Sequence, residues 1–256
     1  MRSNCPRCGC WKRYKIRRGY WRCGKCRYEY RNGSLPLRLK RSGWKRLLAS
    51  FVLEHPSSLI AQESGVERKR VLRALRLVRS AMQRDVPKQF SGTVEVDETY
   101  LGGQWKNKRK PTRDVGTLRG RGTTKQPVFG ILARRGIVWA EVVDDVQAAT
   151  LLPLITGRVK RGSIVCSDTW KAYTGVAAKG YVHRLVDHGK REYARGRAHI
   201  NGLEGFWDYL KRKLAAKGGV RRARLPLYLA EYVWRYNHRN ENNKNKVKQL
   251  LKLLKS

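Results

Sequence analysis

Acidic residues are scarce in this sequence. Only 19 of its 256 residues are Asp or Glu, against 58 Lys and Arg, which gives a formal net charge of +39 at pH 7. A charge of this size repels itself in a compact protein unless a polyanionic partner screens it. The excess of positive charge therefore indicates that the protein binds a polyanion. It favours nucleic acid as the partner, with an acidic membrane surface as the second choice.

Long hydrophobic runs are also missing. No stretch approaches the roughly eighteen apolar residues that a membrane helix needs. The first residues, Met1 to Cys5, have no apolar stretch like that of a signal peptide. We therefore expect a soluble, cytoplasmic, nucleoid-associated protein without membrane contact. Its length suits one domain or two small ones.

Cysteine is absent between residues 27 and 165, and five of the six cysteines lie in the first 26 residues. Two C-x-x-C pairs, separated by 14 residues, have the spacing of a four-cysteine zinc site. The predicted ligands are Cys5, Cys8, Cys23 and Cys26. Disulfides are the alternative, which a reducing compartment disfavours. We expect one structural Zn²⁺ in a zinc ribbon over residues 1–34, with Cys10 and Cys166 outside the ligand set.

Helical periodicity follows over residues 41–84. Apolar residues recur at three- and four-residue steps, and Gly65 makes a turn between a short helix and a long one. This is the outline of a helix-turn-helix. The alternative is a helical hairpin with a merely solvated basic face. The residues expected to contact DNA in the long helix are Arg68, Lys69, Arg70 and Arg73.

From residue 92 the pattern changes to strands that alternate with helices. A meander of three strands comes first, followed by helix and strand in turn, which is the order of the ribonuclease-H-like fold. We therefore expect an α/β core over residues 92–220, with a mixed sheet flanked by helices, and C-terminal basic helices over 221–256. A basic loop, 104–126, interrupts the core. The loop residues expected to add nonspecific DNA contact are Lys106, Lys108, Arg109 and Lys110.

Three acidic residues of the core stand out by position. Asp97 lies within the first predicted strand and Asp168 ends the fourth. Glu204 lies early in a predicted helix, His199 to Leu214, and 35 residues separate it from Asp168. Ligand sites in open α/β sheets lie beyond the carboxyl ends of strands, so these positions can converge. Lys211 follows Glu204 by two helical turns and shares its helix face, where it could meet substrate phosphates.

These features together resemble the DDE transposases of prokaryotic insertion sequences, in particular the group with an N-terminal zinc ribbon. The motifs that carry the resemblance are CPRCG…CGKC, VDETYLGG, SDTWKAY and HINGLEGFWDYLKRKL. The family implies a retroviral-integrase-like core in which Asp97, Asp168 and Glu204 hold two Mg²⁺ (or Mn²⁺) ions. Some members use an asparagine as the third ligand, and Asn201 stands one turn before Glu204. Glu98 points to the opposite face of its strand and is the weaker candidate.

The resemblance also implies an activity and partners. The protein would bind double-stranded DNA at the element ends, cleave it, and join the 3′-hydroxyl ends to target DNA. Two element ends imply a homodimer or a higher oligomer. Two alternatives remain open at this point: a catalytically silent DNA-binding regulator derived from a transposase, and a ribonuclease-H-like nuclease.

Overall fold

The structure is a computed structural model that describes residues 5, 7–17, 19–31, 35–102, 110, 125–134, 136–168, 171–186 and 201–255. The chain forms two compact units, one of Met1–Asp85 with His238–Ser256 and one of Val86–Asn237. No helix among the described residues has the length and apolar character that crossing a membrane requires.

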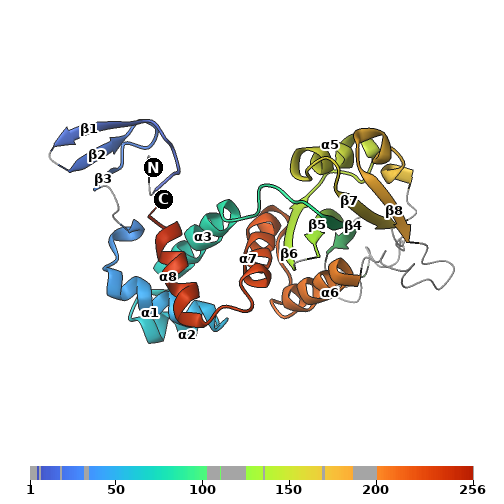
Figure 1. Cartoon of the computed structure of the whole chain (residues 1–256). Helices are drawn as coiled ribbons and strands as arrows, with labels where there is room; N and C mark the ends of the chain where they lie inside the picture. Colours follow the sequence, from blue (N-terminus) through green and yellow to red (C-terminus); the bar gives the residue numbers. More distant parts are fainter. Residues whose placement is uncertain are drawn as a thin grey trace. The chain divides into compact units, whose positions relative to one another are not determined.

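The first unit begins with a small antiparallel sheet (Figure 1). Its strands, in the spatial order β1-β2-β3, are β1 (Arg13–Arg17), β2 (Tyr20–Cys23) and β3 (Glu29–Arg31). A short 3₁₀ turn, Pro36–Arg38, leads to three helices. They are α1 (Arg41–Val52), α2 (Ser57–Ser64) and α3 (Arg68–Arg84). Gly65 takes the left-handed conformation (φ +67°) that ends α2, as the predicted turn requires.

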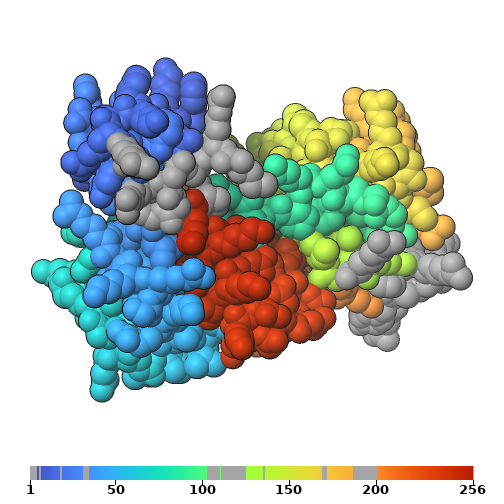
Figure 2. Space-filling model, turned by 60° about the vertical axis from the view of Figure 1, so that its left-hand side comes forward, coloured from blue at the N-terminus to red at the C-terminus, as the bar shows by residue number. Residues whose placement is uncertain are grey.

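The last helix of the chain, α8 (Asn243–Leu253), belongs to this same unit and packs against α1 and α3. Figure 1 shows the red helix α8 beside the blue helix α1, and in Figure 2 red C-terminal residues border blue N-terminal residues. The apolar face of α8 includes Leu250 and Leu251, which are buried. The predicted segment 221–256 is therefore divided, because the apolar face of α8 is buried against the N-terminal helices.

The second unit is a five-stranded mixed sheet with the spatial order β6-β5-β4-β7-β8. Its strands are β4 (Thr93–Leu101), β5 (Gln126–Ala133), β6 (Ile137–Val142), β7 (Ile164–Asp168) and β8 (Val182–Val186). Strands β4, β5 and β6 form an antiparallel meander, and β7 and β8 add parallel to β4. This topology confirms the predicted α/β fold class.

Helices cover both faces of this sheet (Figure 1). They are α5 (Ala148–Arg158), α6 (Asn201–Ala215) and α7 (Leu225–Asn237). Val94 and Val96 of β4 pack in one apolar cluster with α5, whereas Leu203 and Phe206 of α6 pack in a second cluster with α7. Between β7 and β8, where the sequence predicted a helical stretch, the described residues form only short 3₁₀ turns at Lys171–Tyr173 and Ala177–Lys179. The unit spans 86–237, so its bounds also extend beyond the predicted 92–220.

Candidate functional site

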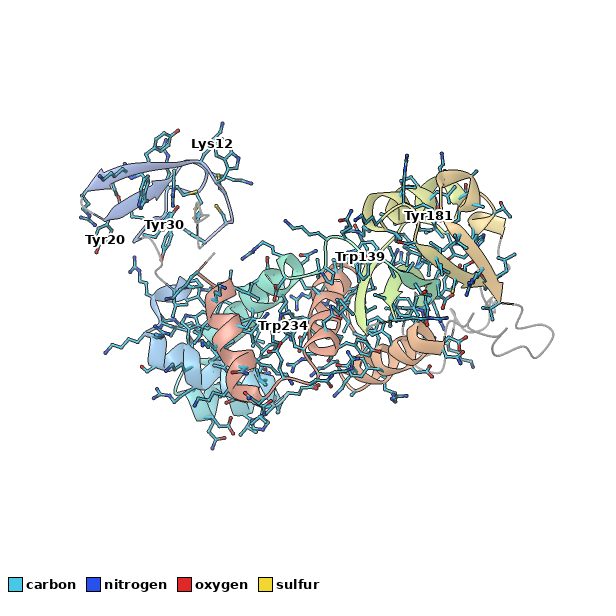
Figure 3. The ribbon with its side chains drawn as sticks, in the orientation of Figure 1. Lys12, Tyr20, Tyr30, Trp139, Tyr181 and Trp234 are labelled. Carbon is cyan, nitrogen blue, oxygen red and sulfur yellow. The ribbon has the colours of Figure 1, made fainter. Side chains whose placement is uncertain are left out.

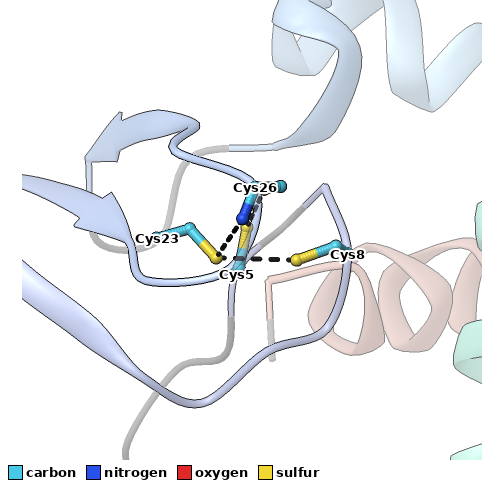
Figure 4. Close-up of side chains that lie close together, drawn as sticks. All are labelled: Cys5, Cys8, Cys23 and Cys26. Atoms are coloured by element: carbon cyan, nitrogen blue, oxygen red, sulfur yellow. Dashed lines mark hydrogen bonds between the residues drawn. The ribbon is translucent and has the colours of Figure 1, made fainter.

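The four predicted zinc ligands converge in the first unit (Figure 4). One sulfur each of Cys5, Cys8, Cys23 and Cys26 lies within 4.8 Å of all the others. The Cys5–Cys26 and Cys8–Cys23 Sγ distances are 3.6 and 3.5 Å. A tetrahedral Zn²⁺ with Zn–S bonds of about 2.3 Å holds its sulfurs roughly 3.8 Å apart. The cluster therefore fits zinc, and Cys10, whose sulfur faces the Lys12 carbonyl at 3.9 Å, stands outside it.

Both cysteine pairs sit on the same kind of turn. Gly9 N–H donates to the Cys5 carbonyl at 2.9 Å, and Arg27 N–H donates to the Cys23 carbonyl at 3.1 Å. Gly9 and Arg27 both have positive φ, +73° and +58°. Burial raises the pKa of the Cys23 thiol, but N–H donors of Cys26 and Lys25 outweigh it, so that the pKa falls to about 6. The cluster thus contains one thiol that readily becomes a thiolate.

The two predicted catalytic aspartates lie on neighbouring strands of the second unit. Strand β4 pairs in parallel with β7, and Glu95 stands opposite Cys166. Extending this register by two residues places Asp97 opposite Asp168, with both side chains on the same face. Both are half-buried. The sheet therefore brings two carboxylates together where β7 ends.

The electrostatics of Asp97 reflect this neighbourhood. Its pKa is raised from 3.8 to about 8, first by burial and then by the negative charges of Glu98 and Asp168. The indole N–H of Trp207 opposes this shift by donating to Asp97 Oδ2 at 3.0 Å. A carboxylate pair whose charges repel each other in a partly buried site is a suitable oxygen donor set for a hard divalent cation. The two aspartates therefore fit the metal that the family implies.

A glycine makes the Trp207 contact possible. Gly130 of β5 stands directly opposite Asp97 in the antiparallel pair. A Cβ added at Gly130 would lie 2.7 Å from the Trp207 ring, closer than real Cβ contacts. The ring of Trp207 thus occupies the space over Gly130, which places its N–H at Asp97.

A second contact joins α6 to the same strand. Glu95 is buried, and its Oε2 accepts a hydrogen bond from Leu203 N–H at 2.9 Å. Gly202 permits this approach, because a Cβ there would lie 2.9 Å from Glu95 Oε2. Arg134 Nε lies 3.9 Å from the other carboxylate oxygen. A buried carboxylate thus caps the start of α6, an arrangement that sequence reasoning missed because Glu95 reads as an ordinary strand residue.

Glu98, the weaker candidate, faces the other side of the sheet. Tyr173 donates its hydroxyl to Glu98 Oε2 at 2.7 Å. Burial, followed by the charge of Glu98, raises the pKa of Tyr173 well above its usual value. Tyr173 belongs to the apolar cluster on the α5 face, whereas Trp207 belongs to that on the α6 face. Glu98 and Asp97 are therefore held on opposite faces by different elements.

The third predicted acid has a different setting. Glu204, Asn201 and Lys211 are all exposed on α6. Among the described residues, the cysteine cluster is the only group of three or more His, Cys, Asp or Glu side chains close enough to hold one metal ion. The structure thus brings Asp97 and Asp168 together but does not gather Glu204 with them. Glu204 lies one turn before Trp207 on the same helix.

A basic cleft occurs in the first unit. It has a volume of about 590 Å³, and six basic side chains and one acid, Glu67, line it together with apolar residues and Tyr28. The six basic residues are Arg7, Arg38, Lys69, Arg70, Arg73 and Arg76. Three of the four predicted DNA-contacting residues are among them, while Arg68 is exposed outside the lining. The predicted set does not include Arg7, Arg38 or Arg76. Arg76 follows Arg73 by about one turn of α3, whereas no local pattern brings Arg7 and Arg38 to this helix.

The turn before α1 shapes this cleft. Leu37 and Arg38 both have positive φ, +61° and +51°, which is unusual for residues other than glycine. Trp44 Nε1 donates to the Pro36 carbonyl at 3.1 Å, and the Arg70 guanidinium donates to the Leu37 carbonyl. Two side chains from α1 and α3 thus hold a strained turn that carries Arg38 to the cleft.

The basic loop falls mostly beyond the described part of the chain. Lys106, Lys108 and Arg109 lie outside the described residues, whereas Lys110 is described and exposed. The predicted role of this loop therefore stays a prediction.

Comparison with known proteins identifies the second unit. The family model described as the ISXO2-like transposase domain matches residues 89–237. An uncharacterized transposase-like protein of Haemophilus influenzae is 36% identical over 118 residues, which cover 46% of this chain and 94% of that protein. Among solved structures, a pre-cleavage Mos1 transpososome aligns over 88% of this chain and 82% of that chain, with 12% identity and a TM-score of 0.25. A Mos1 transposase paired-end complex with the left transposon end gives 88% and 82% coverage, 11% identity and a TM-score of 0.23. The family match covers more than half of the sequence and confirms the resemblance to DDE transposases: this chain belongs to the ISXO2-like transposase family.

Proposed function

We propose that this transposase binds the ends of an insertion sequence, cleaves phosphodiester bonds there, and joins the freed 3′-hydroxyl ends to target DNA. The observation that carries the proposal is the pair Asp97 and Asp168, on neighbouring parallel strands within the family-matched unit. The pKa of Asp97, raised to about 8 first by burial and then by the charges of Glu98 and Asp168, supports a site that takes a cation.

In this proposal Asp97, Asp168 and Glu204 are the ligands of two Mg²⁺ or Mn²⁺ ions. When bound, two such metal ions would neutralise the charge of the scissile phosphate and activate the attacking oxygen. The side chains have the complementary tasks: Asp97 and Asp168 present adjacent oxygens, and α6 supplies the third ligand from its exposed flank. Asn201, one turn earlier on α6, is the alternative third ligand. Lys211, two turns after Glu204, would contact a DNA phosphate.

The first unit would recognise the element ends. Its basic cleft, which is lined partly by α3, matches the charge of a DNA backbone, and this supports DNA binding by the unit through phosphate contacts. The zinc ribbon of residues 1–34 and the helices of 41–84 form this part, and loop 104–126 would add nonspecific contact. Two element ends require at least two protein copies. The protein would act in the cytoplasm, at the nucleoid.

A cleavage assay tests this function. Full-length protein is incubated with duplexes that carry candidate element ends and Mg²⁺, and the products are resolved at single-nucleotide level. We expect cleavage at the element end and joined products with a second duplex, and neither with Asp97→Asn. DNA binding without cleavage under all conditions would favour the silent regulator. Cleavage at positions unrelated to the element end, without any joined product, would favour a nuclease.

A further inference from the structure

Helix α6 is joined to β4 by two hydrogen bonds. Glu95 and Asp97 lie two residues apart on one face of the strand, a separation of about 6.6 Å. Their partners on α6 are the backbone N–H of Leu203 and the indole N–H of Trp207, which belong to residues about one helical turn apart. Neighbouring turns of the same helix therefore each hold one of the two carboxylates.

The two contacts differ in what they restrain. The Glu95 contact uses a backbone N–H, so it fixes where α6 begins. The Trp207 contact uses a side chain that reaches one oxygen of Asp97, so it fixes the orientation of that carboxylate. An ionised carboxylate has about four lone-pair sites, so one bond to the indole leaves acceptor capacity for a cation.

We infer that Trp207 is a positioning residue, whose indole N–H orients the Asp97 carboxylate for a divalent cation. This inference rests on the metal-binding role proposed for Asp97. The packing of Trp207 over Gly130 supports it, because a glycine opposite Asp97 is what lets the ring lie close enough for its N–H to reach Oδ2. Hydrogen bonds that orient metal ligands typically carry a 10- to 100-fold effect on affinity.

The test uses two matched substitutions of buried tryptophan in the full-length, zinc-loaded protein. Trp207→Phe removes the N–H and keeps an aromatic ring over Gly130. Trp139→Phe, on β6 (Figure 3), is the control, because both tryptophans are 3% exposed and Trp139 packs in the cluster on the opposite face of the sheet. Mn²⁺ affinity is measured by the electron paramagnetic resonance signal of the free ion, and folding by thermal unfolding.

We expect Trp207→Phe to weaken Mn²⁺ binding at least tenfold and Trp139→Phe to leave it unchanged, with similar unfolding temperatures for both variants. Nuclear magnetic resonance of ¹⁵N-labelled tryptophan gives a second readout. The indole N–H signal that disappears in Trp207→Phe is expected to shift in Asp97→Asn and on addition of Mg²⁺. Gly130→Ala, which displaces the ring, is expected to weaken Mn²⁺ binding as Trp207→Phe does.

Failure of the inference and failure of the proposed function look different. Equal Mn²⁺ affinity in Trp207→Phe and Trp139→Phe, with binding abolished in Asp97→Asn, would overturn the role of Trp207 and leave the metal site standing. A Trp207 indole N–H signal that does not shift in Asp97→Asn would also overturn the positioning role of Trp207. Unchanged Mn²⁺ affinity in Asp97→Asn would instead reject the metal-binding role of Asp97, and with it the basis of the inference.

Discussion

Gln249 donates a hydrogen bond from Nε2 to Asp85 Oδ2 at 3.1 Å, across 164 positions of sequence. His238 Nε2 lies 2.8 Å from Gln249 Nε2 and 3.9 Å from Asp85 Oδ2. The helix at the C-terminal end of the chain is thereby joined to the residue that follows α3. The N-terminal helices and the last helix therefore belong to one compact unit, and we expect them to unfold together.

Leu250→Ala tests this unit. Leu250 is fully buried, and its truncation should lower the free energy of unfolding of the helical unit by about 2–5 kcal/mol. Hydrogen exchange of amides in α1 and α3 measures the loss. Lys252→Ala, on the exposed face of α8, is the control and should change exchange little. Faster exchange confined to α8 would show that the N-terminal helices are stable without it.

Metal analysis tests the cysteine cluster. We expect one Zn²⁺ per chain, and Cys23→Ser should lose it, because three thiolates leave the tetrahedron incomplete. The same change should unfold the β1–β3 sheet and leave the second unit intact. Cys10→Ser should keep the metal, since the Cys10 sulfur faces a backbone carbonyl. Freshly reduced protein that contains disulfides and no zinc would contradict the assignment.

The third metal ligand is tested by comparing Glu204→Gln with Asn201→Ala in one cleavage assay. We expect Glu204→Gln to abolish cleavage and joining, as Asp97→Asn and Asp168→Asn should, while DNA binding persists. Because these acids would act as one set, a triple variant should be no worse than each single one. An active Glu204→Gln together with an inactive Asn201→Ala would move the third ligand to Asn201.

The pH dependence of stability follows from Asp97. Its pKa is about 8 in the folded protein and 3.8 as a free group, so between these values the folded state holds a proton that the unfolded state has released. Without added divalent metal, the contribution of Asp97 to stability should therefore fall as the pH rises from about 4 to 8. The contribution of Asp97 is the difference in the free energy of unfolding between the wild type and Asp97→Asn, measured by urea unfolding across pH 5–9. Parallel pH profiles for the two proteins would refute the assignment.

The basic cleft is tested through two arginines that lie outside the DNA-contacting set predicted from sequence. Arg38→Ala combined with Arg76→Ala should weaken DNA binding and reduce the log–log salt slope by about 0.9 for each phosphate that the variant no longer neutralises. Lys45→Ala, an exposed basic residue of α1 outside the cleft lining, is the control. An unchanged salt slope in the double variant would place the DNA elsewhere.

The sequence by itself determined the local features of this protein. The spacing of Cys5, Cys8, Cys23 and Cys26 indicated the cluster, because each pair needs only one tight turn. Alternating residues indicated β4, and the three-to-four-residue period indicated α1 and α3, because burial of one face leaves a periodic trace in the chain. The strand order then sufficed for the fold class, and the positions of Asp97 and Asp168 for their juxtaposition.

Only the tertiary structure decided which distant faces meet. Trp207 reads as one more apolar residue of a helix, and Gly130 as one more residue of a strand, until their contact places an N–H at Asp97. The packing of α8 on α1 and α3, and the gathering of Arg38 and Arg76 in one cleft, are likewise invisible locally. The residues of an apolar or basic face indicate that another surface covers or binds that face, but they do not indicate which surface. That choice depends on the simultaneous fit of shapes and hydrogen bonds between segments far apart in the chain.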